Sequence, residues 1–98
     1  MCFPMDIRQL NALVAVVDNG SFSAAAKSLH TVQSNISTHI SRLEKELSVS
    51  LIDRRTGVLT EEGELVVERA RRVQTELESI ALDVEALHSE VAALSVLV

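Results

Sequence analysis

A run of short hydroxyl and amide side chains between residues 31 and 46 is the part of this sequence best equipped for chemistry. Five polar residues in it recur at the spacing of a single helix face, and no carboxylate precedes Glu44. They are Ser34, Ser37, Thr38, Ser41 and Lys45. Hydroxyls bond both base edges and phosphates, and a face without negative charge can approach a polyanion. The pattern indicates a surface for nucleic acid rather than for catalysis.

The opposite face of the same segment is apolar. Its members recur at steps of four, four, three and four, which at about 100° per residue gathers them into one stripe. They are Val32, Ile36, Ile40, Leu43 and Leu47. We therefore predict a helix over residues 32–47 that is buried on one side. A shorter helix over residues 23–29 precedes it, opens with a capping serine at Ser23 and contains three alanines that allow close packing.

Two such helices joined by a tight turn are typical of a helix-turn-helix, in which the second helix reads DNA. An ordinary amphipathic pair in a helical bundle would give the same pattern, with serines that are merely exposed to solvent. The turn at residues 30–32 lacks the glycine that such turns often contain, which favours the bundle. From the pattern alone, the two interpretations are almost equally supported.

Several sequence blocks in a fixed order favour the first interpretation. The blocks are MDIRQL, GSFSAAAKSLH, QSNIS, RLEKEL with the following LIDR, and LTEEGE. With them, the stretch from Met5 to about Arg72 resembles the DNA-binding domain of LysR-type bacterial transcriptional regulators. The resemblance implies a mainly α fold: a winged helix-turn-helix of three helices plus a small β wing, followed by a long dimerising linker helix. It also implies sequence-specific binding to double-stranded DNA, with the recognition helix in the major groove and the wing on the adjacent backbone or minor groove.

Carried over by position, the resemblance implies DNA contacts on both helices and on the wing. These residues are Ser23, Lys27, Gln33, Ser34, Asn35, Ser37, Thr38, Arg42, Arg54 and Arg55. The chemistry agrees, because Gln33 can pair bidentately with adenine and the hydroxyls can bond bases or phosphates. Two features depart from the family pattern. Val32 stands where serine is common, so we expect Thr31 to cap the recognition helix. The segment after Arg54 is short, which leaves open whether Arg54 or Arg55 is the wing arginine.

Caps and periodicity predict the remaining elements. Asp6 and Gln9 form a capping pair for a first helix that ends at Gly20. Its expected apolar face is Ile7, Leu10, Leu13, Val14 and Val17. After residue 48, an alternating pattern predicts a short hairpin with Gly57 at its tip. Thr60 then caps the long final helix.

The tail after Thr60 has the clearest period in the sequence. Its aliphatic residues alternate steps of four and three without a gap: Val66, Ala70, Val73, Leu77, Ile80, Val84, Leu87, Val91, Leu94 and Val98. Such heptad spacing predicts a seam that packs on another helix. As a helix, residues 60–98 would extend roughly 55–60 Å at about 1.5 Å per residue, which is too long to bury the seam on so small a head. A second copy or a further domain of the same chain could cover it.

The charges of the tail favour a second copy in antiparallel orientation. Arg69, Arg71 and Arg72 lie near its start, and acidic residues fill its later half. The resemblance implies the same pairing. Residues up to 58 carry six basic and five acidic side chains, whereas residues from 59 onward carry three basic and nine acidic ones, so the excess of acid behind the net charge of −5 lies outside the head. Because the head is only weakly positive, we expect modest affinity per protomer and a need for dimerisation.

Composition argues against several other functions. Aromatic residues make up 2% of the 98 residues, so a stacking platform for single strands is absent. Three scattered histidines and one cysteine do not match a metal site, and no phosphate-binding glycine loop occurs. We expect no enzyme, no cofactor and no metal. The lone cysteine and the lack of a membrane span or export leader suggest a cytoplasmic, nucleoid-associated protein.

We therefore expect three segments: a leader extension (1–4), a winged helix-turn-helix DNA-binding domain (5–59) and a linker/dimerisation helix (60–98). The effector-binding domain that usually follows in this family is expected to be absent. The expected partners are a dyad-symmetric operator in double-stranded DNA and a second copy bound through antiparallel linker helices, and a full-length context leaves room for a higher oligomer. The alternative from another class is a helical dimerisation module that titrates a full-length regulator without binding DNA itself.

Overall fold

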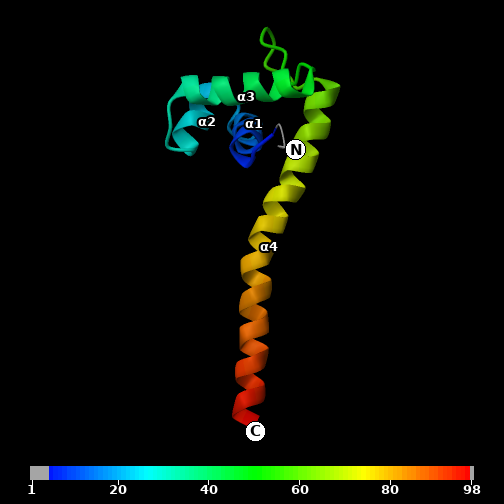
Figure 1. The fold of residues 1–98 in the computed structure, drawn as a ribbon. Helices are drawn as coiled ribbons and strands as arrows, with labels where there is room; N and C mark the ends of the chain where they lie inside the picture. The colour runs from blue at the N-terminus through cyan, green and yellow to red at the C-terminus, as the bar shows by residue number, and fades with distance from the viewer. Residues whose placement is uncertain (1–4, 98) are drawn as a thin grey trace.

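The computed structural model describes the backbone of residues 5–97 and the side chains of residues 5–89. This part of the chain forms α1 (Ile7–Asn19), α2 (Phe22–Ser28), α3 (Gln33–Leu47) and α4 (Glu61–Leu97). The first three helices form a head, and α4 leaves it as a stalk, so the molecule measures 64 × 32 × 22 Å (Figure 1). The mainly α fold predicted from the sequence, with its long final helix, is confirmed.

Both ends of α1 are capped as predicted. The Asp6 carboxylate accepts hydrogen bonds from the backbone N–H groups of Arg8 at 2.8 Å and Gln9 at 3.4 Å, and the Gln9 side chain accepts one from the Asp6 N–H at 3.2 Å. Gly20 ends the helix in the left-handed region, at φ 85°, and its N–H donates to the Val16 carbonyl. These reciprocal bonds satisfy backbone groups that a helix terminus leaves without partners.

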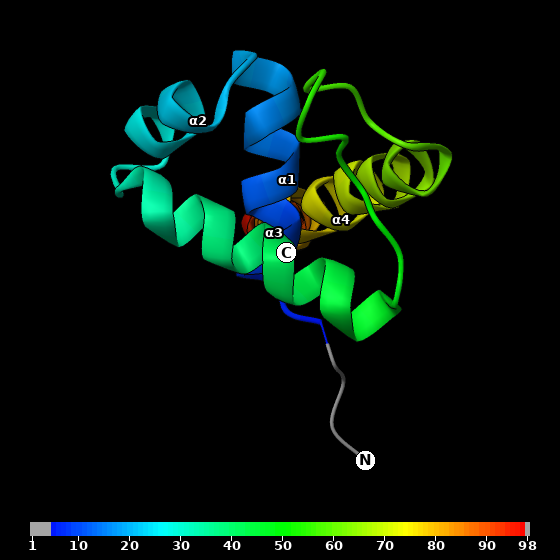
Figure 2. The same cartoon turned by 90° about the horizontal axis from the view of Figure 1, so that it is seen from above.

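The predicted apolar face of α1 is only partly right. Leu13 and Val14 are buried, but Ile7 and Val17 are exposed, and Ala12, Ala15 and Val16 are buried instead. The cause is the central place of α1, which packs against all three other helices (Figure 2). A helix that is covered from several sides buries a wider arc than one stripe, and the small alanines allow the close approach.

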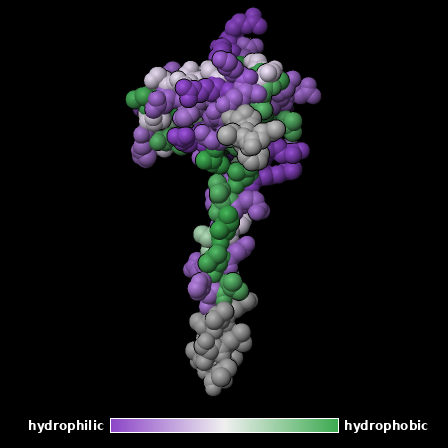
Figure 3. Space-filling view, viewed as in Figure 1, coloured by the Kyte–Doolittle hydropathy of each residue, from purple (hydrophilic) through white to green (hydrophobic). Residues whose placement is uncertain are grey.

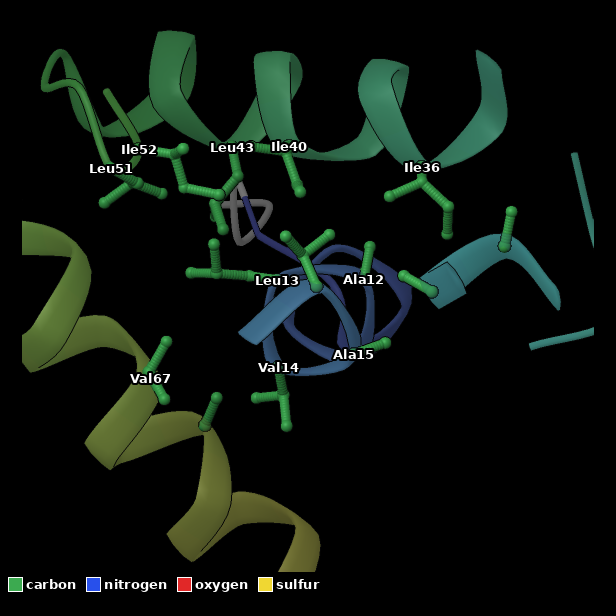
Figure 4. Close-up of a cluster of buried hydrophobic side chains, with 14 residues drawn as sticks. Ala12, Leu13, Val14, Ala15, Ile36, Ile40, Leu43, Leu51, Ile52 and Val67 are labelled. Atoms are coloured by element: carbon green, nitrogen blue, oxygen red, sulfur yellow. The ribbon is translucent and has the colours of Figure 1, made fainter. Parts of the chain in front are cut away.

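The core lies between α1 and the two long helices. Ile36, Ile40 and Leu43 point from α3 toward α1, and Val67 of α4 approaches α1 from the other side (Figure 4). Leu51 and Ile52, from the segment after α3, close the core beside Leu43. Three members of the predicted α3 stripe are thus buried. Leu47 is half-buried and Val32, at the helix end, is exposed.

The helix-turn-helix is confirmed, with two corrections to its caps. α2 begins one residue earlier than predicted, and its cap is Ser21, whose Oγ accepts the Ala24 N–H at 3.0 Å, rather than Ser23. The prediction that Thr31 caps α3 is also wrong, because the N-cap is Val32, which has no side-chain cap bond. Thr31 Oγ1 instead accepts the Asn35 amide at 2.7 Å.

The turn between α2 and α3 forms without glycine because His30 takes the left-handed conformation, at φ 56°. This backbone conformation is costly for a residue with a Cβ. The Thr31 N–H then donates to the Ala26 carbonyl at 2.9 Å, which closes the turn. The missing glycine is therefore no argument against a helix-turn-helix in this chain.

The wing is a minimal hairpin. Its only described β-bridge pairs Ile52 with Leu59 in antiparallel fashion. The Asp53 N–H donates to the Val58 carbonyl at 2.9 Å, and Gly57 lies in the turn at φ 74°, as predicted. The loop stands beside the end of α1 and the start of α4 (Figure 2).

The first turns of α4 belong to the head. Thr60 caps the helix as predicted: its Oγ1 accepts the Gly63 N–H at 3.0 Å and donates to the Ser50 carbonyl at 2.6 Å. Gly63 is buried so close to Leu51 that a Cβ would overlap the Leu51 carbonyl oxygen. Further along, Ala70 is completely buried, so the core continues past residue 60.

Beyond Ala70, two polar contacts hold α4 to α1. The Arg71 guanidinium donates to both carboxylate oxygens of Asp18, at 2.7 and 3.3 Å. The Gln74 amide donates to the Asn11 side-chain oxygen at 2.8 Å. Because each pair joins residues more than 50 positions apart, these contacts define the direction in which the stalk leaves the head.

Candidate nucleic-acid interface

The outer face of α3 is a continuous polar surface. Gln33, Ser34, Thr38 and Ser41 are exposed, and Ser37 is half-buried. The buried side of the same helix is formed by Ile36, Ile40 and Leu43, which point into the core (Figure 4). The structure therefore brings together the four residues of this helix that the sequence analysis assigned to base contacts: Gln33, Ser34, Ser37 and Thr38.

Basic and polar side chains flank this surface. Ser23 and Lys27 of α2 are exposed, as are Arg42 and Lys45 further along α3. Asn35 is also exposed; one N–H of its side-chain amide donates to Thr31, which leaves the second N–H and the side-chain oxygen available to a ligand. Lys45 was predicted to lie on this face but was not included among the candidate contacts.

The first acidic residue of α3 is withdrawn from the surface. The Glu44 side chain is 17% exposed. Its Oε2 accepts the Leu51 N–H at 2.7 Å and the Ile52 N–H at 3.4 Å, and its Oε1 accepts from the Arg54 guanidinium at 2.9 Å. An ion pair and two backbone donors neutralise this carboxylate, so the outer face of α3 presents no uncompensated negative charge before Glu46.

The two wing arginines are in different environments. Arg54 donates to Glu44 and to the Ile52 carbonyl, and its guanidinium lies 5.5 Å from the centroid of the Phe22 ring. Arg55 has a side chain that is 91% exposed, and its ion-pair partner is Asp53 at 3.7 Å. Sequence reasoning did not identify Glu44 and Phe22 as partners of Arg54, because no local motif links residues that the fold brings together.

The stalk carries an exposed apolar seam. Val73, Leu77, Ile80, Val84 and Leu87 are 39–61% exposed and form a stripe along α4 below the head (Figure 3). Two predicted members of the seam do not fit a partner surface, since Ala70 is completely buried against the head of its own chain and Val66 is half-buried there. The side chains of Val91 and Leu94, also predicted seam residues, lie outside the described residues, as does Val98.

The charge argument for antiparallel pairing is wrong for two of its three arginines. Arg71 pairs with Asp18 within the chain, and Arg72 pairs with Glu68 at 2.6 Å on the same helix. Of these three arginines, only Arg69 has no ion-pair partner among the described residues. The Arg71 guanidinium also lowers the pKa of the Asp18 carboxyl by donating hydrogen bonds to it, despite a smaller opposing effect of burial.

In the part of the chain that the structure describes, no three or more His, Cys, Asp or Glu side chains gather where they could hold a metal ion. None of the described helices combines the length and apolar character needed to cross a membrane. The polar face of α3 and the apolar seam of α4 are thus the two surfaces to be explained.

A short helix, a tight turn, a longer helix with a polar outer face and a small wing define the class of winged helix-turn-helix proteins. The family described as "Bacterial regulatory helix-turn-helix protein, lysR family" matches residues 7–64. The chain belongs to this family.

Individual relatives support the assignment to this family. A protein of Azotobacter vinelandii, named an uncharacterized HTH-type transcriptional regulator in the ibpB-leuC intergenic region, is 40% identical over 90 residues, which are 90% of this chain and 62% of the relative. The HTH-type transcriptional regulator BsdA of Bacillus subtilis (strain 168) is 36% identical over 91 residues, 90% of this chain and 31% of BsdA. The chain is thus shorter than both. A crystal structure of the BenM DNA-binding domain with catB site 1 DNA aligns with a TM-score of 0.80 and 30% identity, covering 87% of this chain and 94% of that one.

Proposed function

We propose that this chain binds double-stranded DNA in a sequence-specific manner, as the DNA-binding part of a LysR-type transcriptional regulator. α3 enters the major groove, and the wing contacts the adjacent backbone or minor groove. The observation that carries the proposal is the outer face of α3, where exposed hydroxyl and amide groups are free of uncompensated acid because Glu44 is held by Arg54. The similarity to the BenM domain, whose crystal structure contains DNA, supports it.

In this proposal, the first two turns of α3 read bases. Gln33 has the amide geometry that pairs with adenine, and Ser34, Ser37 and Thr38 bond bases or nearby phosphates. Ser23, Lys27 and Arg42 contact phosphates, which fixes the orientation of the head on the duplex. The chain acts by binding and not by catalysis, at the nucleoid in the cytoplasm.

The proposed active form is a homodimer joined by antiparallel stalks. Five exposed aliphatic residues at heptad spacing need a second helix. The orientation rests on the family resemblance, since Arg71 and Arg72 of the stalk form ion pairs within the chain. Two heads related by a two-fold axis then fit an operator with dyad symmetry.

Selection from randomised duplexes tests the reading of sequence. We expect the wild-type chain to select a dyad-symmetric site. The double variant Gln33→Ala/Thr38→Ala should lose preference at particular base pairs, since a good side-chain pairing to a base contributes roughly 1–3 kcal/mol of discrimination. Ser89→Ala, an exposed serine on the stalk, is the matched control and should select the wild-type site.

Equal base preferences for the wild type and the double variant would show that these two residues do not read sequence. A wild-type chain that dimerises but binds no duplex would contradict the proposal. That result would favour the alternative of a dimerisation module that titrates a full-length regulator.

Sedimentation tests the dimer separately. Leu77→Asp/Ile80→Asp puts two charges on the seam and should yield a monomer, because the charges would lose hydration in the interface without gaining a partner. Leu82→Asp is the matched control, since Leu82 is 64% exposed and outside the seam, and it should remain dimeric. If the wild type sediments as a monomer at tens of micromolar, the pairing of stalks is wrong.

A further inference from the structure

We propose that Arg54 is a positioning residue held by Glu44, and that Arg55 is the wing arginine that contacts DNA. This inference rests on the proposed DNA binding and assigns different roles to two adjacent arginines. It goes beyond the sequence, in which either residue could be the contact.

Arg54 is anchored by three separate parts of the head. One terminal nitrogen donates to Glu44 of α3 at 2.9 Å, the other donates to the Ile52 carbonyl at 3.3 Å, and the guanidinium lies over the ring of Phe22 in α2 at 5.5 Å. The planar fork of arginine can make such contacts at once, which a lysine ammonium cannot. We refer to Glu44, Arg54 and Phe22 as the wing clamp.

The wing needs an external anchor because its own pairing is weak. Between α3 and α4, the structure has a single β-bridge, from Ile52 to Leu59, and an isolated short hairpin is marginally stable in water. Glu44 supplements it by accepting the N–H groups of Leu51 and Ile52 on the first arm of the hairpin. The clamp therefore joins the base of the wing to the recognition helix itself.

Moving Arg54 to a phosphate would be unfavourable. Its departure would leave the Glu44 carboxylate, which is 17% exposed, without its cation and close to a polyanion. Repulsion between this carboxylate and the phosphates would then oppose docking of α3. Arg54 contributes more to DNA binding by neutralising Glu44 than it would by leaving it.

Arg55 meets the requirements of a direct contact. Its side chain is 91% exposed, and the one nearby carboxylate, Asp53, is 3.7 Å away, longer than a good charge-assisted hydrogen bond. The other Asp53 interaction is with the backbone: its Oδ1 accepts the Arg55 N–H at 2.8 Å, which stabilises the turn that carries Arg55. The turn is ordered, whereas the guanidinium is available to a phosphate.

Exchange of each arginine for lysine distinguishes the two roles. The full chain is titrated with its selected duplex over a series of salt concentrations. Arg55→Ala should weaken binding about 10-fold and reduce the salt slope by about 1, as expected for a lost phosphate contact. Arg55→Lys should bind within about 2-fold of the wild type, because a point charge suffices at a phosphate. Arg54→Lys keeps the charge but loses the fork, and should weaken binding about as much as Arg55→Ala.

A double-mutant cycle gives the second readout. If the clamp positions Arg55, then Arg55→Ala should have less than about a 2-fold effect in the Arg54→Lys or Glu44→Gln background. Amide hydrogen exchange of the chain without DNA is measured in parallel. The Leu51 N–H should exchange faster in Arg54→Lys and in Glu44→Ala, which lacks a side-chain acceptor for it, and at the wild-type rate in Arg55→Ala. The N–H groups of the α1 core should keep the wild-type rate in all of these variants, which separates loss of the clamp from unfolding of the head.

The outcomes separate this proposal from the proposed function. Wild-type affinity of Arg54→Lys, or independent effects of the two arginines in the cycle, would refute the clamp while leaving DNA binding intact. Unchanged exchange of the Leu51 N–H in Glu44→Ala would also refute it. A wild-type chain that binds no duplex refutes the proposed function and the clamp with it.

Discussion

Replacement of Gly63 with alanine should destabilise the domain, although glycine is a poor helix former. Propensity alone predicts a gain of about 1 kcal/mol for alanine within a helix. At this position, however, a Cβ would overlap the Leu51 carbonyl oxygen and lie 3.1 Å from the Leu59 Cδ2. That carbonyl also accepts the Thr60 N–H at 2.9 Å, so it cannot move away without weakening the bond next to the α4 cap.

The expected size follows from these opposing terms. Overpacking a buried site typically costs about 1–3 kcal/mol, and contact with backbone favours the upper end. After subtraction of the propensity gain, we expect a net loss of about 2 kcal/mol. For a domain of this size, that corresponds to a fall in Tm of roughly 8–16 °C.

Thermal unfolding followed by circular dichroism measures this effect. Protein concentrations must be equal, because dimerisation makes Tm depend on concentration. Glu62→Ala, at an exposed position of the same helical turn, is the control and should change stability by less than about 0.5 kcal/mol. A Gly63→Ala variant that melts at or above the wild-type temperature would refute the close contact between α4 and Leu51.

Two further predictions concern single interactions. Asp18→Asn should destabilise the chain by no more than about 1 kcal/mol, because its ion pair with Arg71 is half-exposed. The pKa of Asp18 is lowered in the fold, so the stability difference between Asp18→Asn and the wild type should be fully present above the ordinary pKa of 3.8. It should vanish as the pH falls through the pKa of the folded state. Thermal melts at several pH values measure it, and a stability difference that persists in strong acid would contradict the reasoning. His30→Gly should stabilise the domain by about 0.5–1 kcal/mol. Glycine removes the strain of the left-handed backbone conformation at residue 30, and part of this gain is offset because glycine makes the unfolded chain more flexible. Denaturant unfolding measures the change, and a loss of stability would refute the prediction.

Local rules predicted most of the helix ends. The Asp6–Gln9 capping box, the Gly20 terminus and the Thr60 cap depend on residues within four positions of each other, and all three are confirmed. The stripe of α3 was also predictable, because that helix packs on the core from one side. Where a feature depends on nearby residues or on a single packed face, sequence pattern suffices.

Features that depend on distant residues were predicted less well. The wide buried arc of α1 comes from three helices that surround it, which no periodicity within α1 reveals. Ala70 fits the heptad of the stalk perfectly and yet is buried in its own head. The sequence assigned Arg71 to an ion pair with a partner chain, but in the fold it pairs at 2.7 Å with Asp18, which is 53 positions away in the same chain. In each case a tertiary contact uses a residue that the pattern assigned elsewhere.

The weak charge of the head makes its rigidity important for the proposed DNA binding. With six basic and five acidic side chains up to residue 58, the head gains little nonspecific attraction to phosphates. A few correctly placed contacts must then supply the affinity. Their entropic cost is lowest when the contacting side chains already hold the bound arrangement in the free protein. The clamp on the wing and the Asp18–Arg71 contact of the stalk both provide it. The clamp orders Arg55 relative to α3. The Asp18–Arg71 contact holds α4 to α1, on which α3 packs, and so helps to fix the angle between α3 and α4. In a dimer joined through α4, that angle determines the separation of the two recognition helices, so the same contacts that stabilise one head also set the spacing of half-sites that two heads can read.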